Sequence, residues 1–426
     1  MFKTLRNAWA IKEIRNKILF TIFILLVFRV GSVIPVPFIN VDALKTNSND
    51  FFNYLSILTG GGLQYGAIFA LSVTPYINSS IIVQLLTVVF TKLQEWSKEG
   101  EEGQKKLAQL IRYVTIGLAV IQGIAYYIYL ERSNFLTVKG TFAEIYAGIV
   151  LVAVFTAGSA LVMWLGEQID AKGIGNGISM ILFAGIISRA PDAAAYLWGM
   201  IGLKQYVQVA AVIIIFLAVI LFVVWMTAAE RRIAVQYAKR VVGNKMYGGQ
   251  NTHIPIKVNM SGVMPIIFAS SILMLPTMIL SFMGTPKPGF QESFAKVLGL
   301  FSVQGIFYAV VYFFLIIGFA YFYATIQFNP VEMANNLRKN GGAIPGIRPG
   351  QPTAEFIRKI LSRITLIGAL FLSFIAIVPS IVTMAGNMQN LSMGGTSVII
   401  MVGVAIETVK QMESQMMMRH YRGFLD

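Results

Sequence analysis

Residues 60–90 read GGGLQYGAIFALSVTPYINSSIIVQLLTVVF, a stretch that is apolar enough for a membrane but interrupted halfway along. As a helix, residues 63–71 would cover roughly 14 Å at about 1.5 Å per residue, half of a ~30 Å hydrocarbon core. Pro75 then removes a backbone donor and clashes with the preceding turn, so a new helix has to begin there. We therefore predict two helical pieces, each shorter than a membrane crossing, on either side of Pro75.

A broken helix is tolerated at membrane depth only where its freed backbone is buried in protein or faces water. The interrupted stretch therefore predicts a segment that lines a cavity in a multi-pass membrane protein. The competing interpretation is a proline-kinked helix that faces lipid.

The composition places the chain in a membrane. It has 426 residues, of which 56% are hydrophobic and only 12% charged, too apolar a mixture for a soluble domain. It has no cysteine, which excludes disulfides, thiol nucleophiles and cysteine metal sites. The first apolar run, residues 18–36, is long and lacks a small-residue cleavage site, so we expect no cleavable signal peptide.

Ten apolar segments have the length and composition of membrane spans, so we predict an all-α, polytopic membrane protein. They lie at about 18–36, 63–90 (the broken one), 110–130, 145–166, 174–190, 207–228, 258–283, 303–325, 360–382 and 394–412. An even number of spans puts both termini on one side. That side carries 26 of the 34 lysines and arginines, and because basic loops stay in the cytoplasm, both termini are predicted to be cytoplasmic.

The spans divide into two halves, residues 1–200 and 201–426, with five spans each. The second span of each half is unusual: the first half has the broken stretch, and the second has Pro265 and Pro276 among small residues. Five plus five spans with opposite directions is the plan of an inverted repeat, whose functional site lies between the repeats. The fifth and tenth spans open with small residues, which permit close helix approach. We predict two inverted five-helix halves around a central pore.

Two long basic loops face the cytoplasm in this topology, at residues 229–257 and 327–357. In the first, Ile233, Val235 and Tyr237 alternate with polar residues before a Gly243-Asn244 turn signal, which predicts a β-hairpin. The second is rich in Gly, Pro and Asn. We interpret both as docking platforms for an acidic or RNA-rich partner; the alternative is that they are only solvated topology signals.

The sequence gives little support for an enzyme. No histidine lies in a span and no two carboxylates face each other inside one, so we predict no catalytic site, metal or cofactor. A secondary transporter is the stronger alternative, because inverted repeats and broken helices are typical of that class. Coupled transport usually needs ionisable groups near the midplane, whereas here Arg29 lies toward an outer end and Glu407 near an inner one.

The positions that face the centre are aliphatic instead. They come from four helices that the repeat brings together, and they are Val73, Ile77, Leu182, Ile186, Ile267 and Ile400. Each one alone is more simply explained as ordinary packing. Together they predict an apolar constriction, which closes a pore by excluding water.

Five stretches of this chain resemble, in order, the SecY family of protein-conducting channels. They are residues 68–86 (IFALSVTPYINSSIIVQLL), 164–181 (WLGEQIDAKGIGNGISMI), 230–258, 329–350 with its GIRPG, and 394–397 (GGTS). Two positions depart from the family pattern: Ser72 stands where glycine is usual, and Asp170 where a hydroxyl residue is common.

The resemblance implies passive conduction of unfolded secretory and membrane polypeptides with signal sequences across the bacterial plasma membrane. The expected partners are the SecA ATPase or a ribosome as the motor, SecE and SecG as small membrane subunits, and the lipid bilayer. The family's pore ring would fall on the six aliphatic residues above. Its regulatory plug would fall on about residues 60–71, including Gly60, Gly61, Gly62, Leu63, Gly66, Ile68 and Phe69. No charged residue lies between Gly60 and Pro75, so we expect this plug to be held only weakly.

A hydrophobic segment in the pore reaches lipid by parting two helices, and the repeat puts spans two and three against spans seven and eight. Polar residues on these helices are predicted to form a latch across the seam: Asn78, Gln84, Gln122 and Asn259. For the docking surface we predict five basic residues: Arg240, Lys245, Arg338, Lys339 and Arg348. Pro349 restricts Arg348 to an extended backbone, and the flanking glycines allow a tight turn.

Overall fold

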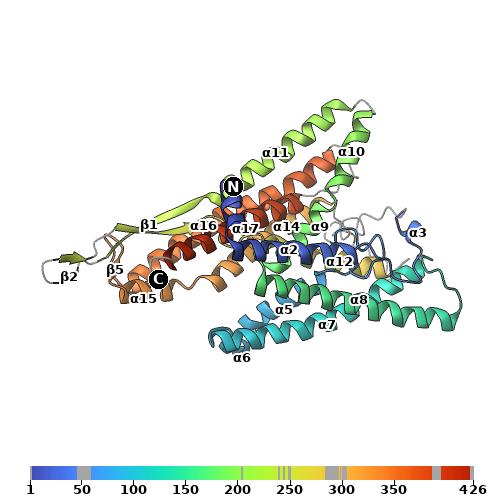
Figure 1. Cartoon of the computed structure of the whole chain (residues 1–426), viewed down its shortest axis with the longest axis horizontal. Helices are drawn as coiled ribbons and strands as arrows, with labels where there is room; N and C mark the ends of the chain where they lie inside the picture. The colour runs from blue at the N-terminus through green and yellow to red at the C-terminus, as the bar shows by residue number, and fades with distance from the viewer. Residues whose placement is uncertain are drawn as a thin grey trace.

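The computed structural model describes residues 2–45, 59–202, 205–237, 240–242, 245–247, 251–283, 305–385 and 395–422, together with 297 and 299. Most of these residues are helical, and long helices lie side by side with a small β-structure projecting at one end (Figure 1). In Figure 1 the C-terminus lies on the side of the molecule that carries the strands, and the N-terminus lies near the middle of the view.

The first half contains nine described helices. They are α1 (Phe2–Ala10), α2 (Lys12–Gly31), α3 (Val41–Lys45), α5 (Thr74–Val89), α6 (Thr91–Lys98), α7 (Glu101–Arg132), α8 (Thr141–Lys172), α9 (Gly177–Ile187) and α10 (Ala190–Gly202). The helices described in the second half are α11 (Tyr206–Ala228), α12 (Met264–Met283), α14 (Ile306–Gln327), α15 (Pro330–Lys339), α16 (Gln351–Ala385) and α17 (Gly395–Arg422).

Each of the ten predicted segments contains a helix, but the structure does not confirm ten full crossings. Over the described residues, six helices are long and apolar enough to cross a bilayer, or up to seven if α5 and α6, which meet at a bend of 104°, count as one span. Short helices account for part of the difference. At about 1.5 Å per residue, the apolar helix over Met264–Leu273 extends only roughly 15 Å.

The two halves use the same pattern of helix neighbours. In the first, α5 contacts α7, α7 contacts α8, α8 contacts α9, and α9 contacts α2. In the second, α12 contacts α14, α14 contacts α16, α16 contacts α17, and α17 contacts α11. Span for span these pairs correspond, which supports the proposed repeat. The halves meet where α17 contacts α1 and α9, where α12 contacts α5 and α7, and where α10 contacts α11.

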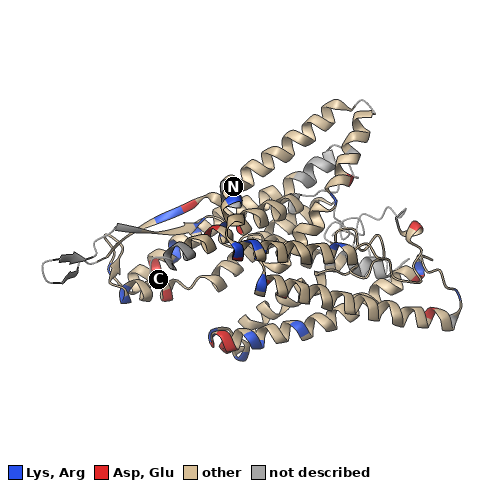
Figure 2. Cartoon of the chain, in the orientation of Figure 1, with Lys and Arg blue, Asp and Glu red and all other residues tan. Residues whose placement is uncertain are grey.

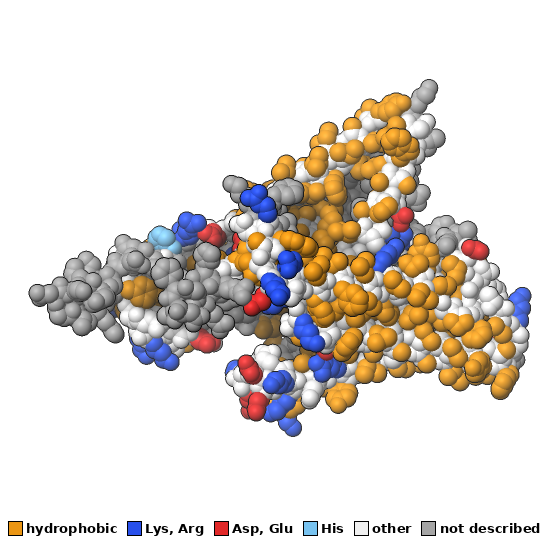
Figure 3. Space-filling model, viewed as in Figure 1, with side chains coloured by type: hydrophobic (Ala, Val, Ile, Leu, Met, Phe, Trp, Pro, Cys, Tyr) orange, Lys and Arg blue, Asp and Glu red, His pale blue; other side chains and the backbone are white. Residues whose placement is uncertain are grey.

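Side chains from both halves form the largest cluster of buried hydrophobic residues, with members on α2, α9, α12 and α17 among others. The close approach expected at the start of the fifth span is confirmed. A Cβ added to Gly177 would lie 1.9 Å from the backbone oxygen of Gly166, so α8 and α9 pack there backbone against backbone. Large hydrophobic residues also cover much of the outside, as Figure 3 shows over the middle of the molecule. This is the surface that a multi-pass membrane protein presents to lipid.

The projecting β-structure comes from both cytoplasmic loops. It consists of β1 (Glu230–Tyr237), β2 (Arg240–Val242), β3 (Lys245–Tyr247), β4 (Asn251–Lys257) and β5 (Gly342–Ala343). The predicted hairpin is confirmed, because β1 pairs antiparallel with β4, while its Gly243-Asn244 turn lies outside the described residues. The sequence did not predict that β5, from the second loop, would pair with β1 on its other edge.

Candidate functional site

The segment that precedes α5 is a compact series of turns over residues 59–73. The predicted helical piece over residues 63–71 is therefore wrong. Gly60, Gly61 and Gly66 have φ of 64°, 93° and 54°, which takes the backbone off the right-handed helical path. The segment bonds instead to the chain that leaves α2: Val36 N donates to Gly66 O at 2.9 Å. Only the second predicted piece is a helix, and Pro75 lies in its first turn, where proline is well tolerated.

Ser72, at the end of these turns, is one of the two departures from the family pattern, and it is strained. Its φ is 49°, its side chain is 1% exposed, and its hydroxyl has no hydrogen-bond partner among the described residues. A left-handed conformation costs a residue with a side chain roughly 1–2 kcal/mol, and a buried polar atom without a partner costs about 1–3 kcal/mol.

We expect Ser72→Gly to stabilise the protein by about 1–2 kcal/mol, because glycine removes both the backbone strain and the unpaired hydroxyl. The greater conformational entropy of glycine in the unfolded chain offsets only part of this gain. The measurement is the free energy of unfolding in a denaturant titration of the purified protein. Asn134→Gly is the matched control, because Asn134 also has positive φ (55°) but is exposed and of a type that adopts this conformation readily. A Ser72→Gly protein less stable than wild type would contradict the assignment of strain.

The segment of residues 60–71 is buried in the first half of the molecule. The Tyr126 hydroxyl, from α7, donates to the Leu63 carbonyl at 2.8 Å. The ring of Phe69 stacks on Phe28 of α2 with 6.1 Å between centroids. Leu63, with later residues of the segment, also belongs to a hydrophobic cluster that includes Leu151 of α8.

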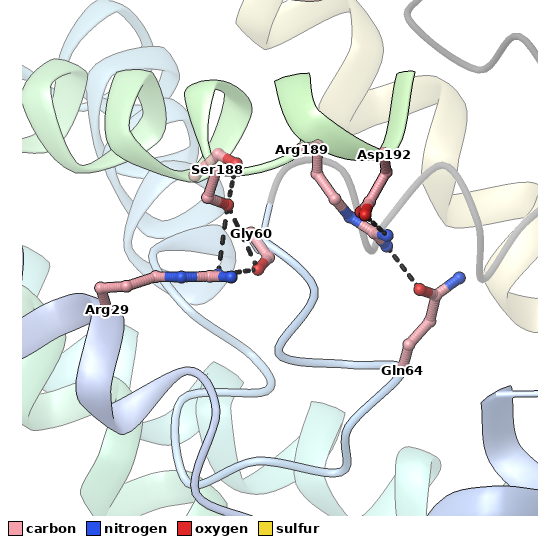
Figure 4. Close-up of polar contacts among 7 residues, drawn as sticks. Arg29, Gly60, Gln64, Ser188, Arg189 and Asp192 are labelled. Carbon is pink, nitrogen blue, oxygen red and sulfur yellow. Dashed lines mark hydrogen bonds and ion pairs between the residues drawn. The ribbon is translucent and has the colours of Figure 1, made fainter. Parts of the chain in front are cut away.

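Two arginines from outside the segment bind it as well (Figure 4). Arg29 Nη1 donates to Gly60 O at 2.6 Å and to Ser188 Oγ at 3.2 Å. Arg189 Nη2 donates to Gln64 Oε1 at 2.5 Å. The expectation of a weakly held segment is thus wrong, because the charges that hold it come from α2 and from the end of α9. The signal that could have found this was Arg29 itself: an arginine inside a span costs about 2.5–3.5 kcal/mol and needs a partner.

The six predicted ring residues are all buried, the most exposed being Ile77 at 9%. They lie at the start of α5 and on α9, α12 and α17, and all six belong to the single hydrophobic cluster shared by the two halves. The structure therefore brings them into one apolar core, and their closure of a pore stays a prediction.

Of the four predicted latch residues, Asn78 and Gln84 lie on α5 and Gln122 lies on α7, two helices that contact α12, while Asn259 precedes α12; a latch between them stays a prediction. Gln122 is buried, and Asn78, Gln84 and Asn259 are half-buried. Gln84 Nε2 donates to Ser80 Oγ at 3.1 Å, within its own helix. Gln84 is therefore engaged along α5 instead of across the seam in this structure.

The predicted docking residues lie on the projecting β-structure, on α15 and on the loop that follows β5. Arg348 is exposed between Gly346 and Gly350, whose φ values are 80° and 107°, and the Thr353 hydroxyl donates to its carbonyl at 2.9 Å. The tight turn predicted from the glycines is thus present.

The other docking residues are Arg338 and Lys339, exposed in the last turn of α15, and Arg240 on β2 and Lys245 on β3, whose side chains lie outside the described ones. Figure 2 shows Lys and Arg gathered at the end of the molecule that carries β1, α15 and α6.

Comparison with known proteins decides what this arrangement is. The family model for SecY matches residues 67–409. The chain belongs to the SecY family. The SecY protein translocase subunit of Bacillus subtilis is 44% identical over 440 residues, covering 100% of both chains, and that of Streptomyces scabiei is 42% identical over 447 residues with the same coverage. The prediction of a multi-pass protein translocase subunit is therefore confirmed.

Solved structures agree with the SecY assignment at the level of fold. A protein-conducting channel superimposes with a TM-score of 0.70 at 18% identity, covering 94% of this chain and 92% of the other. A SecY structure, whose plug domain is reported to stabilise the closed state of the channel, superimposes with a TM-score of 0.69 at 18% identity and the same coverage. The channel of the canine ribosome–channel complex gives 0.65 at 17% identity, again over 94% and 92%.

Proposed function

We propose that this SecY-family subunit conducts unfolded polypeptides across the bacterial plasma membrane through a pore between its two halves. The observation that carries the proposal is the buried aliphatic set at their interface: six residues, drawn from helices of both halves, in one cluster. An apolar constriction excludes water and ions at rest without binding a particular substrate. That property suits a pore that has to pass chains of any sequence.

In this proposal residues 60–71 are the plug. The segment is built from turns, contacts α2, α7 and the residues at the end of α9, and immediately precedes α5, whose first residues contribute to the constriction. A segment with no regular helix of its own can leave its site without melting a membrane span. The transporter alternative gains no support, because Arg29 is bound to this segment and Glu407 is exposed.

The partners we propose are SecE and SecG in the membrane, and the SecA ATPase or a ribosome on the cytoplasmic side, where both termini would lie. Support for membrane partners comes from α11, which exposes large apolar side chains such as Val207, Leu221 and Trp225. Such an apolar surface in a membrane protein contacts either lipid or the helices of small membrane subunits. Support for a cytoplasmic partner comes from the exposed basic side chains of Arg338, Lys339 and Arg348.

Hydrophobic segments would leave for the lipid through the seam where α12 meets α5 and α7. Because the chain has no native cysteine, one cysteine placed on the α12-facing side of α5 and one on α12 can be crosslinked without background. We expect this crosslink to reduce membrane insertion of a hydrophobic segment about tenfold or more, and a reducing agent to restore it, since a closed seam removes the route to lipid.

The measurement is insertion into proteoliposomes that contain the complete translocase. The control is a cysteine pair between α7 and α8, which are neighbours within the first half and do not have to part. Insertion at the full rate through a quantitatively crosslinked α5–α12 seam would exclude this exit.

A further inference from the structure

Arg29 joins three segments of the first half that are far apart in the sequence. It lies in the last turn of α2, and one of its guanidinium nitrogens, Nη1, donates both to Gly60 O at 2.6 Å and to Ser188 Oγ at 3.2 Å (Figure 4). Gly60 begins the plug segment and Ser188 directly follows α9. The C-terminal ends of α2 and α9 therefore meet at this cation, and helix C-termini carry the partial negative charge that stabilises one.

Ser188 is oriented for this role by its own helix. Its hydroxyl donates to Gly185 O at 2.7 Å, whereas Gly60 O is a longer 3.4 Å away. With its single proton used on Gly185, the hydroxyl oxygen is free to accept from Arg29. Ser188 therefore remains a partner of the guanidinium whether or not Gly60 is present.

Gly60 can reach the guanidinium only as a glycine. Its φ is 64°, and a Cβ at this position would lie 3.0 Å from the Cα of Gly185 and 3.2 Å from Ser188 Oγ. The backbone of the plug thus rests directly on the end of α9. Any side chain there would push the Gly60 carbonyl away from Arg29.

We propose that Arg29 is the positioning residue that holds the plug shut. It binds the plug carbonyl strongly, because a hydrogen bond from a charged donor is about twice as strong as a neutral one. When the plug leaves, the guanidinium keeps Ser188 as an acceptor. Its charge is therefore not left without a hydrogen bond, and the contact between Arg29 and Gly60 can form again. Arg189, which binds Gln64 beside it, is a second contact to the plug. This inference rests on the proposed function of residues 60–71 as the plug.

The test uses the complete translocase in planar bilayers and compares Arg29→Gln with wild type. We expect resting ion conductance to rise about tenfold. Arg29→Lys should restore part of the seal, because it keeps the charge and loses the planar fork. Gly60→Ala should leak like Arg29→Gln, and the double variant should leak no more than either, since both remove one contact. The controls are Lys139→Gln, an exposed charge, and Gly100→Ala, which has φ of 77° and open space around it.

A second readout separates release of the plug from general loosening. A cysteine at Leu63, 4% exposed, should react faster with a membrane-impermeant maleimide in Arg29→Gln than in wild-type background. A cysteine at Leu151, which is buried in the same cluster on α8, should stay protected in both. Unchanged conductance and labelling in Arg29→Gln would overturn the proposal, and so would equal deprotection of both cysteines. Deleting residues 61–70 tests the plug itself: a tight channel after deletion refutes the plug, whereas a leak after deletion without a leak in Arg29→Gln refutes only the role of Arg29.

Discussion

Arg348→Glu is expected to reduce polypeptide translocation at least about thirtyfold, the effect of losing about 2 kcal/mol of a charged contact with the motor. The channel itself should still fold and span the membrane, because the Arg348 side chain is exposed and its reversal disturbs no buried contact. The measurement is transport of a secretory precursor into vesicles with matched amounts of channel.

The turn around Arg348 explains why this one position should matter so much. Positive φ at Gly346 and Gly350 and the bond from Thr353 to the Arg348 carbonyl hold the backbone in one shape, so the guanidinium starts from a defined point. A planar guanidinium binds carboxylate or phosphate in a two-point geometry that an ammonium does not reproduce. Arg348→Lys should therefore retain only part of the transport rate.

Lys98→Glu and Lys172→Glu are the controls for net charge, because both lysines are exposed, lie on the same predicted side, and stand outside the two long loops. Each should change transport by less than about twofold, as is usual for isolated surface charges. Equal transport by Arg348→Glu and wild type would mean that the loop serves only as a topology signal.

Ile400→Asn is expected to make the resting channel leak ions and to relax its demand for a good signal sequence. An amide in an apolar constriction binds water, and a wetted constriction conducts. Ile186→Asn and Ile267→Asn should behave in the same way, since both residues lie in the same buried cluster. Single-channel conductance in planar bilayers and export of a precursor with a defective signal sequence are the two measurements.

Ile399→Asn is the matched control for the ring. Ile399 is as buried as its neighbour, at 1% against 2%, and belongs to the same cluster. Successive helical residues point about 100° apart, so only one of the two can face the centre squarely. Both variants should lose similar stability, but only Ile400→Asn should leak. A leak of equal size from both would show that the sealing role is not specific to the six predicted residues.

Patterns that depend on neighbouring residues predicted the structure well. Alternation of Ile233 and Val235 identified the strand that became β1, and Pro75 marked the start of α5. Helices also form at the predicted span positions, because each requires only a run of apolar residues, although the structure does not confirm ten full crossings. The segment before α5 was harder: its composition fits a half-helix, but three glycines with positive φ and backbone bonds to residues 34–36 override that local preference.

Contacts between distant segments were outside the reach of sequence patterns. Gly60 and Ser188 are 128 positions apart, and nothing in either segment indicates that Arg29 lies between them. Similarly, Gly342–Ala343 is too short a strand to identify by alternation, yet it pairs with the edge of β1. Such pairings depend on how whole helices pack against one another, and the residues near each contact carry no local pattern that indicates this packing.

The pairing of β5 with β1 has a mechanical consequence. β1 continues directly from α11, β4 leads into α12, and β5 joins α15 to α16, so one small sheet links four helices of the second half. An apolar core shared by Ile233, Leu337 and Ile357 stiffens the junction. A force applied to either loop is therefore transmitted to all four helices at once. The first half receives this force where α10 contacts α11, where α12 contacts α5 and α7, and where α17 contacts α1 and α9, so a push on the loops acts on the contacts between the two halves.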